Sequence, residues 1–175
     1  VWINVDRLDF AVNAIFTSDG WSPGALHWQM LRTQDPILAV HEIYENGPLL
    51  QRAIRLGRWI HLVAVLSKDS GRTRYYVDGQ LAQENQLPAD ARSAPGSGLL
   101  GDWLQEAYDP YPKRNLRARI DEFAIWNRAL TQAEVVEMTR AGAPSMLTLA
   151  DRLVPVPAPV DGARFPGGAG RKKRR

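Results

Sequence analysis

The chain of 175 residues contains no cysteine. This absence excludes disulfide bonds, thiolate catalysis and zinc sites with cysteine ligands, but it does not fix the compartment, because many bacterial exported domains also lack cysteine. No stretch approaches the roughly 20 consecutive apolar residues of a membrane-spanning helix. The sequence also has no glycine-rich phosphate loop, no Gly-x-Ser-x-Gly motif and no paired-histidine zinc motif.

Positive charge is concentrated at one end of the chain. The formal net charge is +3, from 22 basic and 19 acidic residues, and the terminal run Arg171–Arg175 supplies five of the basic ones. A run of this kind can contact nucleic acid or an anionic membrane, and the alternative is a solvated terminus or a cut end. Because the remaining residues carry no positive excess, we do not expect the folded body to bind nucleic acid.

The first 130 residues show the short alternating patterns of strands. Val1–Asp6 and Leu26–Met30 alternate apolar and polar positions, whereas Trp59–Leu66 is apolar on both faces, which is typical of a central strand. Turn signals separate such segments, at Asp19-Gly20, Asn46-Gly47, Ser70-Gly71 and Asp78-Gly79. Asp78-Gly79 is the strongest hairpin signal. Short strands at this spacing predict a sandwich of two antiparallel sheets.

One helix and a tail follow. Thr131 and Glu134 have the spacing of a capping box, Gly142 suits the C-terminal cap, and Pro144 prevents continuation. The predicted buried stripe of this helix consists of Val135, Val136 and Met138. Prolines and glycines dominate from about Leu153 onward, leaving too little apolar material to offset the entropy of ordering. We therefore predict one domain over residues 1–143 and a disordered tail with a basic end over 144–175.

Two motifs carry a family resemblance. The first is Trp59, His61 and the apolar run that follows, together with the hairpin sequence Tyr76-Val77-Asp78-Gly79. The second is Ile120-Asp121-Glu122 followed by Asn127–Thr131, with Ala118 where the family commonly has glycine. In both, the chain resembles the laminin-G-like jelly-roll domains of the concanavalin A-like lectin/glucanase fold, in their bacterial type.

The resemblance implies an all-β fold, an antiparallel two-sheet jelly-roll sandwich with one short C-terminal helix. It also implies a recognition or adhesion module of a larger exported protein, at the cell envelope, in the periplasm or outside the cell. The given sequence begins at Val1, inside a strand-like pattern, so it offers no signal peptide to read. Family domains have further strands before the one that Val1–Asp6 resembles, so we expect an N-terminally truncated domain with an exposed sheet edge.

Related jelly rolls include glycoside hydrolases, which need two carboxyl groups about 5 to 5.5 Å apart in retaining enzymes. Asp121 and Glu122 are adjacent, and adjacent strand residues point to opposite faces of a sheet. The pair is therefore not a catalytic dyad, and we predict a non-enzymatic domain. Asp121 is expected to accept structural hydrogen bonds, and Glu122 to pair with an arginine such as Arg128.

Aromatic residues in two loops are the best candidates for contacts to a sugar, because flat rings stack on its C–H faces. The loops are Asp19–Gly24, which leads to His27, and Gly101–Tyr111. The predicted ligand-binding residues are Trp21, His27, Trp103, Tyr108 and Tyr111. The alternative is that Trp103 and at least one tyrosine pack the second loop onto the sandwich, in which case the domain is a structural spacer or a protein–protein module with no small ligand.

Acidic residues of the same two loops suggest calcium, which some family members hold at a loop rim with hard oxygen ligands. The candidates are Asp19, Asp102 and Asp109. The histidines His27, His41 and His61 lie on three separate predicted strands, and their spacing does not indicate a shared metal. The expected partner is a carbohydrate or a protein surface.

Overall fold

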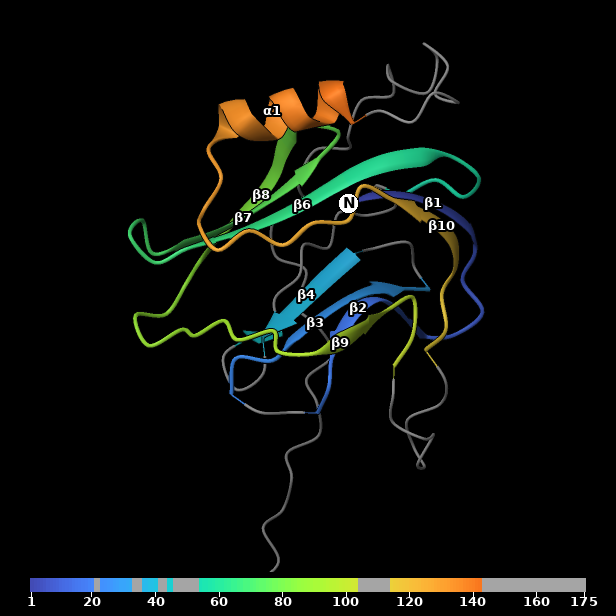
Figure 1. The fold of residues 1–175 in the computed structure, drawn as a ribbon, viewed down its shortest axis with the longest axis horizontal. Coiled ribbons are helices and arrows are strands. Elements are labelled where there is room, and N and C mark those ends of the chain that lie inside the picture. Colours follow the sequence, from blue (N-terminus) through green and yellow to red (C-terminus); the bar gives the residue numbers. More distant parts are fainter. Residues whose placement is uncertain (21–22, 33–35, 41–43, 46–53, 104–113, 143–175) are drawn as a thin grey trace, which may run out of the picture.

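The computed structural model describes residues 1–20, 23–32, 36–40, 44–45, 54–103 and 114–142, of which 36–40 and 44–45 are described by their backbone alone. Two antiparallel sheets pack face to face, and the helix α1 covers the outer face of one of them (Figure 1). The two-sheet sandwich with one short helix predicted from the sequence is confirmed. No helix of the described residues is long and apolar enough to span a membrane.

Each sheet has five strands. The helix-side sheet has the order β10-β1-β6-β7-β8, with bounds β10 Arg117–Asp121, β1 Trp2–Arg7, β6 Trp59–Ser67, β7 Arg72–Val77 and β8 Gln80–Gln86. The opposite sheet has the order β5-β4-β3-β2-β9, with bounds β5 Tyr44–Glu45, β4 Pro36–Val40, β3 Leu26–Leu31, β2 Val12–Ser18 and β9 Gly98–Leu100. Sequence neighbours pair in both sheets, while β10 closes against β1 from the far end of the domain.

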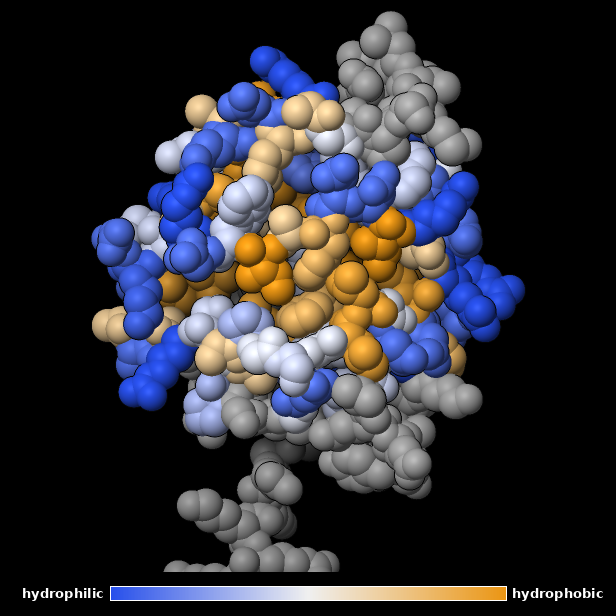
Figure 2. All heavy atoms as spheres, in the orientation of Figure 1, coloured by the Kyte–Doolittle hydropathy of each residue, from blue (hydrophilic) through white to orange (hydrophobic). Residues whose placement is uncertain are grey.

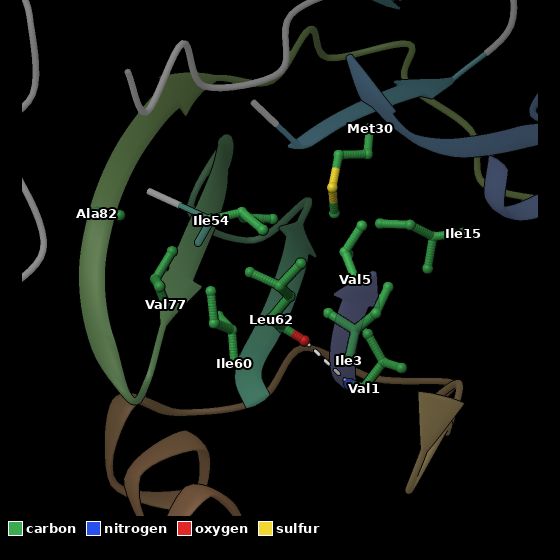
Figure 3. Close-up of a cluster of buried hydrophobic side chains, with 10 residues drawn as sticks. All are labelled: Val1, Ile3, Val5, Ile15, Met30, Ile54, Ile60, Leu62, Val77 and Ala82. Atoms are coloured by element: carbon green, nitrogen blue, oxygen red, sulfur yellow. Dashed lines mark hydrogen bonds between the residues drawn. The ribbon is translucent and has the colours of Figure 1, made fainter. Parts of the chain in front are cut away.

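The main core lies between the two sheets (Figure 3). Apolar side chains of β1, β6 and β7 meet those of the opposite sheet, among them Ile15 and Met30, which are fully buried. The main chain of β1 is held in register with β10 and β6, where Ile3 lies opposite Ile120 and Ile60. The central position of β6, predicted from its two apolar faces, is confirmed, because Ile60 enters this core while its other face packs elsewhere.

That other face of β6 packs against α1 (Gln132–Ala141). Val63 and Val65 form a second buried cluster with Tyr76 of β7 and Val135 of the helix. The predicted capping box is present, since the Thr131 hydroxyl accepts from the Glu134 N–H while the Glu134 carboxylate accepts from the Thr131 N–H. Of the predicted stripe, Val135 is fully buried, Met138 packs partly on the cluster and Val136 is only half-buried.

The β7–β8 hairpin anchors the helix. Asp78 and Gly79 form its two-residue turn with φ of 49° and 79°, as the Asp-Gly signal predicts. The Gly79 carbonyl accepts a hydrogen bond from the Gln132 side chain at 3.0 Å, and an added Cβ at Gly79 would lie 3.2 Å from the Thr139 hydroxyl. The turn therefore sets the distance between sheet and helix. Asp78 also binds back to β6, accepting from the His61 N–H at 2.8 Å.

His61 joins β6 to the helix through its side chain. The Thr139 hydroxyl donates to the Val135 carbonyl at 2.8 Å, so it accepts from Nδ1–H of His61, 2.7 Å away. The ring stacks on Trp2 with centroids 5.0 Å apart. Burial, followed by the nearby α-ammonium of Val1, lowers the pKa of His61 to about 3. The imidazole is therefore neutral and carries its proton on Nδ1.

We expect this neutral histidine to make the domain acid-sensitive. An unfolded histidine titrates near 6.5, so between about pH 6.5 and 3 the unfolded state binds one more proton than the folded state. The contribution of His61 to the free energy of unfolding is present in full above pH 6.5. It decreases as the pH is lowered, by up to about 1.4 kcal/mol per pH unit. Urea denaturation from pH 7 to 3.5 measures it. His61→Phe keeps a ring beside Trp2, and its free energy of unfolding should decrease less steeply with falling pH than that of the wild-type protein. Equal slopes in both proteins would contradict the assignment of a neutral His61.

Candidate functional site

The outer face of the opposite sheet carries a row of buried polar side chains. In β3, Trp28 and Met30 pack on the core, so His27 and Gln29 point to the outer face, because side chains alternate along a strand. Thr17 lies directly opposite His27 in the β2–β3 pair. These three polar residues are between 1% and 5% exposed. A sheet face turned away from the core and yet buried must be covered by loops.

One covering loop follows β9. Its chain reverses at Gly101, where φ is +72°, and the Gly101 N–H donates to the Ile15 carbonyl at 2.9 Å. The Thr17 hydroxyl then donates to the main-chain oxygen of Asp102 at 2.7 Å. Because Thr17 points to the outer face, this hydrogen bond brings Asp102 and the neighbouring Trp103 onto that face. The candidate site is therefore defined by Thr17, His27, Gln29, Asp102, Trp103 and Arg114, and we call it the outer polar face.

The other predicted loop reaches the same face through His27. The His27 side chain is 1% exposed, and its Nε2 lies 3.2 Å from the carbonyl oxygen of Gly20. The Ser18 hydroxyl accepts from the Leu26 N–H at 2.9 Å and ties the two ends of this loop together. The structure thus brings the described ends of the two sequence-predicted loops, Gly20 and Asp102, to one sheet face, with His27 as a buried support. Trp21 lies outside the described residues.

The Trp103 side chain is packed against the protein rather than exposed to solvent. Its side chain is 8% exposed, and the guanidinium carbon of Arg114 lies 3.9 Å from the ring centroid, within cation–π distance. Arg114 is itself 8% exposed, and its carbonyl accepts from the Ala14 N–H at 2.7 Å. This is the geometry that the packing alternative predicted for Trp103. The ring face under Arg114 is closed to a ligand, so Trp103 has a packing role.

Sequence reasoning did not identify Arg114 or Gln29 as members of the site. Arg114 lies beyond the predicted loop Gly101–Tyr111, and Gln29 was one polar position of the alternating segment Leu26–Met30. The signal that was present is a set of polar residues at every second position of two paired strands, Thr17 on one and His27 and Gln29 on the other. Such a pattern is typical of an outer sheet face, and only the burial shows that the face is covered.

The acidic candidates for calcium make local contacts. Asp19 accepts a hydrogen bond from the Ser97 hydroxyl at 2.6 Å, and Oδ1 of Asp102 accepts from the Trp103 N–H at 2.7 Å. The described part of the chain contains no group of three or more acidic, histidine or cysteine residues placed to hold a metal. Asp109, Tyr108 and Tyr111 lie outside the described residues, so calcium binding and the tyrosine contacts stay predictions.

Asp121 and Glu122 lie at the end of β10 in the helix-side sheet, not at the outer polar face. Asp121 accepts from the Glu122 N–H at 2.9 Å, which is a structural role, but within its own turn rather than toward a neighbouring loop. Glu122 has φ of +50° and turns the chain away from the sheet. The expected partner Arg128 instead pairs with Glu134 at 2.6 Å, because the capping box places that carboxylate beside it. The expected Glu122–Arg128 pair was therefore wrong.

Comparison with proteins of known sequence gives two pentraxin-related proteins, both named PTX3. The human protein is 24% identical over 144 residues, covering 78% of this chain and 37% of its own length. The mouse protein is 26% identical over 122 residues, covering 66% of this chain and 31% of its own length. The chain thus spans about a third of the curated relatives it matches.

Solved structures share the fold at low sequence identity. A Bacteroides ovatus protein named as a putative carbohydrate-binding protein matches with a TM-score of 0.60 and 17% identity, over 78% of this chain and 38% of that one. The CBM40 domain of a Ruminococcus gnavus sialidase, bound to α2,3-sialyllactose, matches with a TM-score of 0.55 and 10% identity, over 79% and 80%. The model of the concanavalin A-like lectin/glucanase superfamily, of laminin-G-like type, matches residues 1–136. With this match and the two-sheet sandwich, the chain belongs to the concanavalin A-like lectin/glucanase superfamily.

Proposed function

We propose that this domain is a non-catalytic carbohydrate-binding module that binds its ligand at the rim of the outer polar face. The observation that carries the proposal is that one described end of each predicted loop, Gly20 and Asp102, contacts the same sheet face, at His27 and Thr17. The names of two structural neighbours, a carbohydrate-binding protein and a sialyllactose-bound module, support the ligand class. The setting that we propose is a larger exported protein, outside the cell or at its envelope.

The chemistry of the face suits a neutral, hydroxyl-rich ligand. Sugars present donors and acceptors together with apolar C–H faces, and a site for them combines uncharged polar groups with aromatic rings. Gln29 is 5% exposed, and its side-chain nitrogen has no hydrogen-bond partner among the described residues. A buried donor of this kind favours a ligand or water that accepts from it. Because Trp103 is closed by Arg114, the stacking surface is assigned to Trp21, Tyr108 and Tyr111.

The packed Trp103 also supports a second candidate function, a structural spacer or protein–protein module without a small ligand. In that case the two loops serve only to cover the sheet, and Arg114 and Trp103 hold them in place. The two functions differ in one measurable respect. A spacer has no glycan that its loop aromatics select, whereas a lectin-like module loses its glycan when those aromatics are removed and the fold is kept.

We expect a glycan array probed with the purified protein, with and without calcium, to show selective binding. Trp21→Ala and Tyr108→Ala should each weaken that binding by about tenfold or more, since loss of one stacking ring costs on the order of 1–2 kcal/mol. Trp126→Ala is the matched control, because Trp126 is 50% exposed and lies beyond β10, away from the outer polar face. It should leave glycan binding unchanged.

Two outcomes of these experiments would refute part or all of the proposed function. Binding that survives both loop substitutions would place the ligand elsewhere on the domain and refute the proposed site. A folded protein that selects no glycan on the array would refute the carbohydrate function and favour the spacer. Loss of binding on removing calcium would support the ion at Asp19, Asp102 and Asp109, and equal binding with and without calcium would remove it from the proposal.

A further inference from the structure

The segment that joins the two sheets is fixed at its start. We call residues 87–97 the crossover, because they lead from β8 of the helix-side sheet to β9 of the opposite sheet (Figure 1). The Leu87 N–H donates to the Gly71 carbonyl in the β6–β7 turn at 2.8 Å. Leu87 and Ala91 are buried and line an apolar groove together with Leu26 of β3. Figure 2 shows apolar side chains gathered at the centre of the face on which this groove opens.

The last residues of the crossover contact both ends of the loop Asp19–Gly24. At the first end, the Asp19 N–H donates to the Ser97 carbonyl at 2.9 Å, and the Ser97 hydroxyl donates to Oδ2 of Asp19 at 2.6 Å. At the second end, the Ala94 N–H donates to the Gly24 carbonyl at 2.9 Å. One short part of the crossover, residues 94–97, therefore clamps this loop at its two ends.

Gly24 is the position at which the loop and the crossover pack most tightly. It is buried, and its φ of +89° lies in the region that favours glycine. A Cβ added to Gly24 would lie 3.0 Å from the Ala94 nitrogen and 3.3 Å from the Ala94 Cβ. A side chain at this position would therefore push the loop away from the crossover and strain the hydrogen bond between them.

We propose that Ser97 and Ala94 of the crossover are positioning residues for the carbohydrate site, acting through the two ends of the loop Asp19–Gly24. This inference rests on the proposed function, because it concerns the same site. Together with the His27 contact to Gly20, the clamp fixes the loop by hydrogen bonds from two sides. A loop that is held in place before binding loses less conformational freedom when the ligand arrives. The crossover therefore raises affinity without contacting the ligand.

Binding of the array-selected glycan to loop and crossover variants, followed by surface plasmon resonance, tests the positioning role. Gly24→Ala should weaken binding by about tenfold, mainly through faster dissociation, because the loop separates from Ala94. Gly96→Ala is the matched control, since Gly96 lies in the crossover with φ of +57° and an added Cβ there would have no atom within 4 Å. It carries similar backbone strain and should leave glycan binding unchanged.

Substitutions at Ser97 test the other end of the clamp and cost little stability, because the Ser97–Asp19 hydrogen bond is exposed. Ser97→Ala should weaken glycan binding by about threefold, whereas Ser97→Thr keeps the hydroxyl and should bind like the wild-type protein. Asp19→Asn keeps an acceptor oxygen for Ser97 and should also retain binding. Loss of binding in Asp19→Asn with none in Ser97→Ala would contradict the clamp at this end and assign the Asp19 carboxylate to an ion.

Hydrogen exchange of the Asp19 and Ala94 amides, followed by NMR, tests the clamp without any ligand. Both amides should exchange about tenfold faster in Gly24→Ala than in Gly96→Ala, and equal exchange rates would overturn the clamp. Equal glycan affinities of these two variants would overturn the positioning role. Failure of the proposed function has a different signature, because the wild-type protein itself then selects no glycan while the two amides still exchange faster in Gly24→Ala.

Discussion

Replacing Trp103 by alanine is expected to lower the free energy of unfolding by about 3–4 kcal/mol. The indole is 8% exposed and is covered by Arg114, so truncation removes a large buried side chain and leaves a cavity under the guanidinium. The cation–π contact adds to the loss, because Arg114 then keeps its burial without the ring. Urea denaturation at pH 7 measures the effect.

Two variants separate packing from ligand contact at this position. Trp103→Phe keeps an aromatic ring under the guanidinium and should cost clearly less than alanine. Arg114→Met keeps much of the side-chain volume that covers the indole but removes the positive charge. It should therefore lose only the electrostatic part of the stabilisation. A Trp103→Ala protein that loses glycan binding while keeping its stability would show that the ring is displayed in solution, contrary to the structure. We expect Trp103→Ala to lose both stability and glycan binding, because the packed ring supports the loop.

The second large effect is expected at Gly98, the first residue of β9. A Cβ added there would collide with the Thr17 carbonyl oxygen and would lie 2.9 Å from the Phe16 ring. Both belong to β2, which pairs with β9, so relief requires the two strands to separate. Gly98→Ala should therefore lower the free energy of unfolding by about 3 kcal/mol, at the upper end of ordinary overpacking costs. Thermal and urea denaturation are the measurements.

Gly96→Ala is the control for this prediction. Gly96 has φ of +57°, and a Cβ added there would have no atom within 4 Å, so only backbone strain opposes alanine at this position. That strain costs about 1 kcal/mol. A Gly98→Ala protein no less stable than Gly96→Ala would mean that β9 lies farther from β2 than the structure places it. Because β9 leads directly to Gly101 and Asp102, loosening it should also disturb the outer polar face.

Much of the fold follows from local patterns. The Asp78-Gly79 turn, the capping box of Thr131 and Glu134, and the two apolar faces of β6 were all predicted and confirmed. Each depends on residues close in sequence, either through a backbone conformation that few residues adopt or through alternation along one strand. Even the place of β6 in the middle of its sheet follows, because a strand with two apolar faces needs cover on both.

The candidate site was predicted only in outline. The two loops and His27 were identified as a group, but the role of Trp103 was left open between display and packing. Its burial depends on Arg114, 11 positions later in the chain, and on the contact of Asp102 with Thr17, 85 positions earlier. Sequence patterns do not indicate which side of a loop contacts a distant strand. The exposure of an aromatic side chain in a loop can therefore be determined only from the tertiary structure.

The sequence by itself determined the strand segments Val1–Asp6, Leu26–Met30 and Trp59–Leu66, the Asp78-Gly79 hairpin and the capped helix, because hydrogen bonding and alternation within short segments specify them. Tertiary structure alone decided that Gly20 and Asp102, from the two loops, contact one sheet face and that Arg114 covers Trp103. It also decided that Arg128 pairs with Glu134. These contacts join segments whose spacing in the chain says nothing of their distance in space, and packing of the two sheets brings them together.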